Sequence, residues 1–258
     1  MVGVHIGLEG KVAIVTGGSR GIGEAIARAF VAHGARVAIA SRKLDGVTAT
    51  AEAIAREHGT SNILPLAAHT GKEDECARLV RDAIGHFGKV DVLVNNAGTS
   101  LHFGPMVSAE GGAWDKMFEV NLKGYFWCAR EVARHLAGRE APGSIVNVAS
   151  VLGLMTHAMQ GVYAMSKAAV ISMTKTLALE LGPSKIRVNA IAPGFVETRL
   201  VSAVLKNESL LKDVVQRTPL GRYGQPDEIA GGALYLASDA ASFLTGHTLV
   251  IDGGLTIG

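Results

Sequence analysis

One stretch decides the fold, Thr16-Gly17-Gly18-Ser19-Arg20-Gly21-Ile22-Gly23, which joins a β-branched run to an alanine-rich helical pattern. Glycine permits a tight turn and lets backbone N–H groups approach a pyrophosphate, which the positive end of the following helix favours. A glycine-rich turn without a ligand is the alternative. The spacing lacks the Gly-Lys-Ser/Thr sequence of kinases and GTPases. The position between a strand and a helix favours dinucleotide binding, and the candidate contacts are Gly17, Ser19, Arg20, Gly21, Ile22 and Gly23.

Outward from this stretch, short apolar runs alternate with amphipathic runs along the whole chain. The expected strands are 11–16, 35–41, 62–67, 90–95, 143–150, 186–191 and 247–251. The expected helices are 22–33, 45–58, 72–87, 110–137, 161–181, 199–215 and 227–237. Strands that are apolar throughout are typical of a sheet covered on both faces. The pattern predicts an α/β fold with a doubly wound parallel sheet, in a single domain of residues 1–258.

Glycine marks the ends of several expected helices. A left-handed residue commonly ends a helix, and glycine adopts that conformation at little cost. We expect such turns at Gly34, Gly59, Gly88 and Gly182.

Composition and charge exclude several classes of protein. The chain has 258 residues, with 25 Lys and Arg against 23 Asp and Glu, and a formal net charge of +2. No basic block exceeds Arg42-Lys43, so we expect no nucleic-acid partner. Cys76 and Cys128 lack metal-ligand spacing, which favours reduced thiols and no metal site. The uncharged stretch 141–166 is too polar for a membrane span, and we expect no signal peptide.

The residues after the second expected strand bear on the choice of dinucleotide. A carboxylate there binds the adenosine ribose of NAD, whereas an arginine accommodates the 2′-phosphate of NADP. The sequence is Ser41-Arg42-Lys43, with no carboxylate before Asp45, and Arg20 can approach the same phosphate. Solvated surface arginines are the alternative. The pattern favours NADP(H), with Ser41, Arg42 and Lys43 as candidate contacts.

A tyrosine and a lysine are spaced to share one face of the expected helix 161–181. Tyr163 and Lys167 are four residues apart, and an ammonium near a phenol lowers the pKa of the phenol toward working pH. Alone this is a weak signal, because a surface pair arises easily by chance. Ser150 strengthens it, since it ends an expected strand and ligands of open α/β sheets bind at those ends. Its hydroxyl can donate to a substrate carbonyl oxygen, and a helix-capping serine is the alternative.

Together these residues resemble the short-chain dehydrogenase/reductase family over essentially the whole chain. The matching motifs, in order, are the loop 16–23, Asn95-Asn96-Ala97-Gly98, Asn121, Ser150, Tyr163 with Lys167, and Pro193-Gly194 followed by Thr198. The resemblance implies one Rossmann-type domain with seven parallel strands, usually in a homotetramer. It implies that Tyr163 donates a proton, that Ser150 orients the carbonyl and that Lys167 contacts the nicotinamide ribose. It also implies that Asn121 holds a water in the proton relay.

The resemblance implies further cofactor contacts. They are Asn95, Ala97 and Gly98 behind the adenine ribose, and Pro193, Gly194, Val196 and Thr198 near the nicotinamide carboxamide. One position departs from the family pattern. Many members carry an aspartate that contacts the adenine amino group, and His69 stands there instead. We retain His69 as a candidate cofactor contact, with a capping or solvent role as the alternative.

The pattern around His69 is similar to that of NADPH-dependent carbonyl reductases of animal peroxisomes, as are Phe103-Gly104-Pro105 and Trp114-Asp115-Lys116. The chain ends in Thr256-Ile257-Gly258 rather than their peroxisomal tripeptide, so we expect a cytoplasmic location. The expected reaction is reduction of a ketone or aldehyde by NADPH. A cap at about 195–216 is expected to set substrate choice. The candidate substrate-side residues are largely apolar: Thr99, His102, Leu152, His157, Gln160, Phe195, Val196 and Leu200.

Other functions are compatible with the sequence. The chain resembles 3-oxoacyl-[acyl-carrier-protein] reductases almost as well, although the arginines that meet the acidic carrier are represented by Arg139 and by Ser184 beside Lys185. An NAD-dependent sugar or polyol dehydrogenase is a third candidate. The non-enzyme alternative is a dinucleotide-sensing binder, which is disfavoured because Asn121, Ser150, Tyr163 and Lys167 are all retained.

Overall fold

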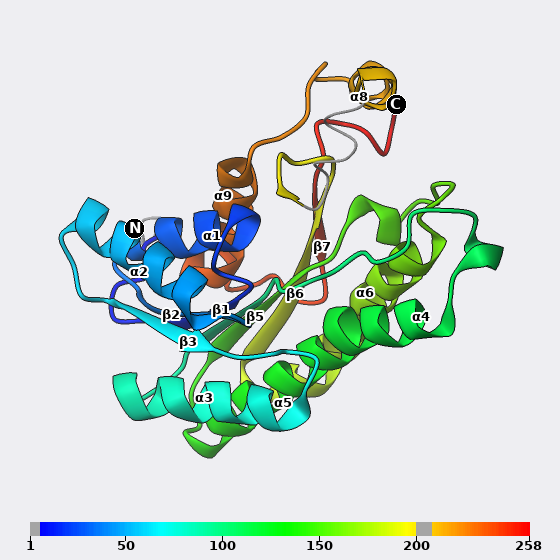
Figure 1. Ribbon diagram of the computed structural model, residues 1–258. Helices are drawn as coiled ribbons and strands as arrows, with labels where there is room; N and C mark the ends of the chain where they lie inside the picture. The colour runs from blue at the N-terminus through cyan, green and yellow to red at the C-terminus, as the bar shows by residue number, and fades with distance from the viewer. Residues whose placement is uncertain (1–5, 200–207) are drawn as a thin grey trace.

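A parallel sheet forms the centre of the computed structural model, which describes residues 6–199 and 208–258. Within these residues the sheet has seven strands in the order β3-β2-β1-β4-β5-β6-β7, and every neighbouring pair is parallel (Figure 1). The strands are β1 (Val12–Thr16), β2 (Arg36–Ser41), β3 (Ile63–Ala67), β4 (Val92–Asn95), β5 (Gly143–Val148), β6 (Ile186–Pro193) and β7 (Thr248–Ile251). The strand order reverses between β1 and β4, as in a doubly wound Rossmann fold. The predicted α/β architecture is confirmed.

Helices cover both faces of this sheet (Figure 1). One layer contains α1 (Gly21–Ala32), α2 (Leu44–His58) and α9 (Pro226–Ala237). The other contains α3 (Glu73–Phe87), α4 (Gly111–Phe118), α5 (Gly124–Gly138) and α6 (Gly161–Leu181). Near the carboxyl terminus of the chain lies α8 (Glu208–Arg217) (Figure 1). The expected helices 22–33, 45–58, 72–87, 161–181 and 227–237 agree with this arrangement.

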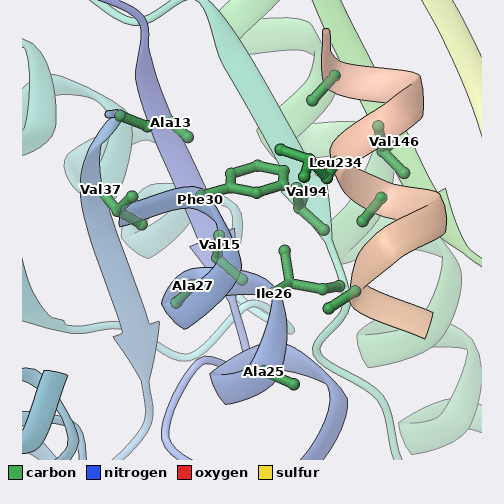
Figure 2. Packing of buried hydrophobic residues seen from close by; sticks show 14 of the residues in the cluster. Ala13, Val15, Ala25, Ile26, Ala27, Phe30, Val37, Val94, Val146 and Leu234 are labelled. Atoms are coloured by element: carbon green, nitrogen blue, oxygen red, sulfur yellow. The ribbon is translucent and has the colours of Figure 1, made fainter. Parts of the chain in front are cut away.

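An apolar cluster attaches the first helical layer to the sheet. Ile26 and Phe30 of α1 pack against Val15 of β1, Val94 of β4 and Leu234 of α9 (Figure 2). The Phe30 ring has no solvent exposure, so its burial contributes about 2–3 kcal/mol to folding. The helix that follows the glycine-rich loop is therefore fixed against both the sheet and the last helix of the chain.

The opposite face of the sheet has its own apolar cluster. It includes Ile14 of β1, Leu79 of α3 and Leu136 of α5, whereas Ala13 and Val15 of β1 belong to the first cluster. Successive side chains of a strand point to opposite faces, so a strand that is covered on both sides must be apolar throughout. All five residues of β1 are accordingly buried.

The expected single helix at 110–137 is divided in the structure. A π-helical segment, η2 (Glu119–Lys123), separates α4 from α5 and contains Asn121. The Asn121 side chain accepts from the backbone N–H of Thr99 at 2.8 Å and donates to the Thr99 carbonyl oxygen at 2.9 Å. The helical pattern gives no sign of the interruption, because its partner is a loop distant in sequence. Such segments occur frequently at functional sites.

Three of the four predicted left-handed glycines are confirmed and one is wrong. Gly34, Gly59 and Gly88 have φ values of 85°, 59° and 82°. Gly182 has φ −54° because the helical backbone continues into a 3₁₀ turn, η4 (Gly182–Ser184). The left-handed turn is made instead by Lys185 (φ 60°), immediately before β6.

Two kinds of feature are not found among the described residues. No helix there is both long enough and apolar enough to cross a membrane. No group of three or more His, Cys, Asp and Glu side chains in residues 6–199 and 208–258 could hold a metal ion. Cys76 and Cys128 are free and buried.

The parallel arrangement gathers the predicted site at one edge of the sheet. Asn95 ends β4 beside Asn147 of β5, and Val148 at the end of β5 lies beside Ile191 of β6. The loops that leave these carboxyl ends carry the cofactor and catalytic candidates. Ligands of open α/β sheets bind at this edge.

Candidate active site

Ser150, Tyr163 and Lys167 meet beyond the carboxyl end of β5. Ser150 is the cap of a 3₁₀ turn, η3 (Val151–Gly153), and Tyr163 and Lys167 lie in the first two turns of α6. The Ser150 hydroxyl lies close enough to the Tyr163 phenol to lower the pKa of that phenol. Lys167 Nζ lies 5.8 Å from the centre of the Tyr163 ring. The fold therefore brings together the three residues that the sequence marked as a unit.

The environment of Tyr163 keeps the proton on the phenol. Burial raises the pKa of Tyr163 to about 12, and the neighbouring Ser150 hydroxyl opposes this rise. The sequence predicted that the Lys167 ammonium lowers the phenol pKa, but Ser150 provides the lowering in the structure. A phenol with this pKa is protonated at neutral pH, so it is suited to donating a proton rather than accepting one.

Lys167 is almost completely enclosed, with 3% of its surface exposed. Its Nζ donates to the Val148 carbonyl oxygen at 2.7 Å and to the Tyr125 phenol oxygen at 3.3 Å. Burial lowers the pKa of Lys167 to about 7. A Cβ placed on Gly98 would lie 3.7 Å from Nζ. Because Gly98 has no side chain, space remains beside the amine.

Asn121 is connected to the same residues through Ser166. Its Nδ2 donates to the Ser166 hydroxyl at 3.1 Å, and that hydroxyl donates to the Tyr163 carbonyl oxygen at 2.7 Å. The Asn121 side chain has no solvent exposure. The asparagine thus holds the start of α6 against the loop at Thr99. The relay water remains a prediction.

The glycine-rich loop forms a cradle that side chains would fill. A Cβ on Gly17 would lie 2.8 Å from Asn96 Nδ2, and one on Gly23 would lie 2.3 Å from the Gly17 carbonyl oxygen. The helix α1 begins at Gly21, and the side chain of its N-cap residue, Arg20, makes no capping hydrogen bond. The first N–H groups of α1 are therefore left for an anion, which the helix dipole favours. The loop fits the pyrophosphate of a dinucleotide.

Other predicted contacts support the cradle from within the protein. The Thr50 hydroxyl donates to the Ser19 carbonyl oxygen at 3.1 Å, and the Ser41 hydroxyl donates to the Lys43 carbonyl oxygen at 3.0 Å. Ile22 packs against the first apolar cluster. The first of these bonds joins the turn to α2, and the second stabilises the chain locally at the end of β2.

Basic side chains gather where an additional phosphate is predicted. Arg42 and Lys43 are exposed directly after β2. His69 follows β3, and its Nδ1 accepts from the Gly71 N–H at 3.0 Å, so Nε2 carries the proton of the neutral ring. Burial lowers the pKa of His69, and the positive charges of Lys116 and Arg42 lower it further. Arg42, His69 and Lys116 come from different elements, and the charges of Arg42 and Lys116 act on the region around His69.

The segment 95–98 divides between interior and surface. Asn95 has no solvent exposure, and its Nδ2 donates to Asn147 Oδ1 at 3.0 Å and to the Tyr125 carbonyl oxygen at 3.1 Å. Ala97 is half-buried and Gly98 is exposed. Any direct contact with a dinucleotide therefore falls to Ala97 and Gly98, while Asn95 supports them from inside the sheet.

The segment after β6 faces the glycine-rich loop. Pro193 is the last residue of β6, and the N–H of Gly194 donates to the end of β7 at 3.0 Å. Val196 is buried, and Thr198 lies beside α1, since a Cβ on Gly21 would be 3.4 Å from Thr198 Cγ2. Two predicted cofactor segments that are far apart in sequence are thus neighbours.

Several predicted substrate-side residues are also brought together. Leu152, His157 and Phe195 line a small hollow with Met155, Leu255 and side chains of α8. Thr99 is held by Asn121. His102 contacts the nearby Pro105 carbonyl oxygen, and Gln160 accepts a hydrogen bond from the Ser100 hydroxyl, 60 residues away in the sequence. Leu200 and the cap residues up to 207 lie outside the described residues.

Comparisons with known proteins agree with this geometry. A family profile described as enoyl-(acyl carrier protein) reductase matches residues 17–256. The chain is 40% identical to a 3-oxoacyl-[acyl-carrier-protein] reductase of Thermotoga maritima, over 97% of this chain and 99% of that protein. It is 37% identical to the dehydrogenase/reductase SDR family member 4 of Oryctolagus cuniculus, over 96% and 94%. The chain belongs to the short-chain dehydrogenase/reductase family.

Solved structures of family members share the whole fold. A gluconate 5-dehydrogenase from Burkholderia cenocepacia, in complex with NADP and tartrate, has a TM-score of 0.94 and 33% identity, covering 99% of this chain and 98% of that one. A 3-ketoacyl-(acyl-carrier-protein) reductase from Brucella melitensis, complexed with NADH, has a TM-score of 0.90 and 36% identity, covering 97% and 100%. As a member of this family, the chain is an oxidoreductase that acts on carbonyl or alcohol groups with a nicotinamide dinucleotide.

Sequence reasoning missed Tyr125, whose hydroxyl contacts Lys167. The available signal was its position four residues after Asn121, which places both on one side of a regular helix. A tyrosine on an apolar helix face is most often a packing residue, so this spacing is a weak signal. The contact with a lysine 42 residues away cannot be predicted from spacing. The lowered pKa of Lys167 is likewise a property of the folded chain.

The buried Lys167 makes a pH-dependent contribution to stability. Its pKa falls from 10.5 in the unfolded chain to about 7, so the unfolded state binds one more proton between these values and stability rises with pH. The free energy of unfolding of the cofactor-free chain is compared with that of Lys167→Met. We expect the difference, wild type minus variant, to rise by up to about 1.4 kcal/mol per pH unit between pH 7.5 and 9.5. Urea unfolding at several pH values measures this difference. A flat difference would show that Lys167 titrates normally.

Proposed function

We propose that this chain reduces a ketone or aldehyde to an alcohol with NADPH, and that Tyr163 donates the proton. The observation that carries the proposal is that Ser150, Tyr163 and the Lys167 amine lie together at the carboxyl end of β5. The glycine cradle opens at the same edge of the sheet. A carbonyl group and a dinucleotide can therefore meet there.

The residues of the chain have complementary tasks in this reaction. The reduced nicotinamide, when bound, supplies the hydride to the carbonyl carbon. Ser150 stabilises the negative charge that develops on the carbonyl oxygen by donating a hydrogen bond. Tyr163, protonated at neutral pH, gives its proton to that oxygen. The carbonyl gains one hydride at carbon and one proton at oxygen, which completes the alcohol.

In this proposal Lys167 stabilises the deprotonated Tyr163, and a water held by Asn121 returns a proton to it from solvent. An ammonium at Lys167 favours the phenolate left behind, because opposite charges attract across a buried site. A Cβ on Gly98 would lie 3.5 Å from Asn121 Oδ1 and 3.7 Å from Lys167 Nζ, so the free space at Gly98 borders both groups. We assign this space to the nicotinamide ribose, held by Lys167, and to the relay water, held by Asn121.

The basic residues after β2 support NADPH as the preferred dinucleotide. Arg42 is exposed at the end of β2, where a carboxylate would select NAD, and its charge reaches His69 after β3. Arg20 of the glycine-rich loop is also free of any capping bond. A 2′-phosphate would find cations from both the loop and β2.

The lining of the substrate side supports an apolar substrate. Leu152, Met155, Phe195, Val214 and Leu255 contribute carbon surface to the hollow, and His157, Asp213 and Arg217 are its polar members. Apolar lining with few polar groups selects compact hydrophobic molecules. We therefore propose a hydrophobic ketone, aldehyde or dicarbonyl compound.

Reduction of 3-oxoacyl-[acyl-carrier-protein] is the second candidate function, because of the 40% identity to the Thermotoga maritima reductase. The candidate residues for docking the carrier protein do not lie at the carboxyl ends of the strands, where Ser150 is. Arg139 donates to the Val90 carbonyl oxygen at 3.2 Å and pairs with Asp91, both ahead of β4. Ser184 and Lys185 precede β6. These are the amino ends of the strands, about 20 Å from the Ser150 end of the same subunit, which favours the first candidate.

We also propose that the chain works as a homotetramer. Phe126 of α5 and Leu179 of α6 are 41% and 82% exposed, although both are large and apolar. These helices form the outer layer on one face of the sheet (Figure 1). Exposed apolar side chains on such a layer suit contacts between subunits.

Replacing Tyr163 tests its role as the proton donor. Tyr163→Phe removes the hydroxyl and keeps the ring, so we expect NADPH affinity to change little and turnover to fall by about 10²–10⁴. Fluorescence titration measures binding, and nicotinamide absorbance measures turnover. Tyr235→Phe on α9 is the matched control, and normal activity of Tyr163→Phe would remove this residue from the mechanism.

Reversing the charge of Arg42 tests the preferred dinucleotide. In Arg42→Asp a phosphate contact is lost and a repulsive carboxylate is gained, so we expect the Kd of NADPH to rise by about 10–100-fold and that of NADH to change much less. Arg81→Asp on α3 is a control for net charge. Equal losses for both dinucleotides would contradict a specific contact with the 2′-phosphate.

A substrate panel separates the candidate functions. It contains aromatic ketones, α-dicarbonyls, an acetoacetyl thioester and keto-sugars, each with NADPH and with NADH. We expect kcat/KM for apolar ketones and dicarbonyls with NADPH to exceed that for the thioester by about tenfold or more. Preference for the thioester would favour the second candidate, and preference for keto-sugars with NADH would favour the third. Dinucleotide binding without any turnover would favour a sensor.

A further inference from the structure

A buried tyrosine completes the surroundings of Lys167. Tyr125 is 1% exposed, and its hydroxyl donates to the Val148 carbonyl oxygen at 3.1 Å. Lys167 Nζ donates to the same carbonyl at 2.7 Å and to the Tyr125 hydroxyl oxygen at 3.3 Å. Nζ also lies 5.0 Å from the centre of the Tyr125 ring. The three groups form a closed set of hydrogen bonds beneath the candidate site.

The backbone holds this tyrosine firmly in place. Tyr125 is the second residue of α5, and its carbonyl oxygen accepts from Asn95 Nδ2 at 3.1 Å. The preceding Gly124 packs so closely against Thr70 that a Cβ would lie 2.3 Å from the Thr70 carbonyl oxygen. The start of α5 therefore cannot move without disturbing β4 and the loop after β3.

We infer that Tyr125 is a positioning residue for Lys167, which fixes Nζ beside Val148 and stabilises its ammonium form. The inference rests on the proposed function for its consequence in catalysis. An ammonium has three N–H donors. Two are satisfied inside the protein by Val148 and Tyr125, and the space at Gly98 remains for the third.

The other groups around this pair are few. In the described part of the chain, the titratable groups that act on Tyr125 are Tyr163 from α6 and Cys128 from α5. Facing it, β5 offers the Val148 carbonyl oxygen. Burial alone lowers the pKa of Lys167. The Tyr125 oxygen is therefore one of two acceptors that oppose the cost of burying the charge.

Replacement by phenylalanine separates the hydroxyl from the packing of the ring. Tyr125→Phe keeps the ring beside Nζ, and the Val148 carbonyl oxygen retains its hydrogen bond from Lys167. No buried acceptor is left without a partner, so the variant is expected to fold. A hydrogen bond to a charged group shifts a pKa by about one unit.

The first measurement uses the free chain without cofactor or substrate. Trace acetylation of amines over a range of pH, read by mass spectrometry at the peptide that contains Lys167, gives the midpoint of its titration. We expect the midpoint in Tyr125→Phe to lie about one pH unit below that of the wild type. An unchanged midpoint would overturn the inference.

The second measurement uses NADPH-dependent carbonyl reduction. We expect the alkaline decline of kcat in Tyr125→Phe to begin about one unit lower, so that kcat is about tenfold reduced above the midpoint and less than about twofold reduced at lower pH. A merely structural role would reduce kcat equally at every pH, and that result would also overturn the inference.

Val132→Ala supplies the matched control. Val132 is fully buried on the same helix and has no contact with Lys167 among the described interactions. This variant should lower the melting temperature and leave both pH midpoints unchanged. If both variants moved the midpoints equally, loosening of α5 would be the cause and the inference would fail. If the chain reduced no carbonyl compound, the acetylation midpoint would still decide whether Tyr125 holds Lys167.

Discussion

The parallel register of β4, β5 and β6 is the constraint on which the rest of this structure depends. It aligns Asn95 with Asn147 and Val148 with Ile191, so that the chain leaves the sheet at one edge after each strand. Residues separated by scores of positions in sequence then lie within hydrogen-bonding distance. The apolar clusters on both faces maintain this register, because a shift of one residue would exchange the side chains that pack into the two clusters.

Within this fold the protein buries the Lys167 amine, and burying its charged form costs considerable free energy. Lowering the pKa of Lys167 from 10.5 to about 7 disfavours its charged form by about 5 kcal/mol. The Val148 carbonyl oxygen and the Tyr125 hydroxyl offset part of this cost. The same enclosure raises the pKa of Tyr163 to about 12. Burial thus moves the two groups in opposite directions, toward a neutral phenol and a readily titrated amine, which suits proton donation at neutral pH.

The interruption of the helix at η2 shows how the site depends on distant contacts. Asn121 bonds to Thr99 on one side and to Ser166 on the other, and it thereby joins the loop after β4 to α6. A regular helix from 110 to 137 was the natural expectation from the apolar pattern. The π segment is stabilised by hydrogen bonds from outside the helix, so local sequence preference could not reveal it. The same holds for Gly182, where the continuation of the backbone into η4 moved the left-handed turn to Lys185.

The sequence by itself determined the fold class and the order of the elements. It also indicated that the glycine-rich loop, Ser150, Tyr163 and Lys167 belong to one site. These follow from local periodicity, from glycine where no Cβ fits, and from motif spacing. Only the tertiary structure decided that Asn95 supports the site from within, that Ser150 rather than Lys167 lowers the pKa of Tyr163, and that Tyr125 holds Lys167. The physical reason is that burial and hydrogen bonding across elements depend on which surfaces pack together, and spacing along the chain does not contain that information.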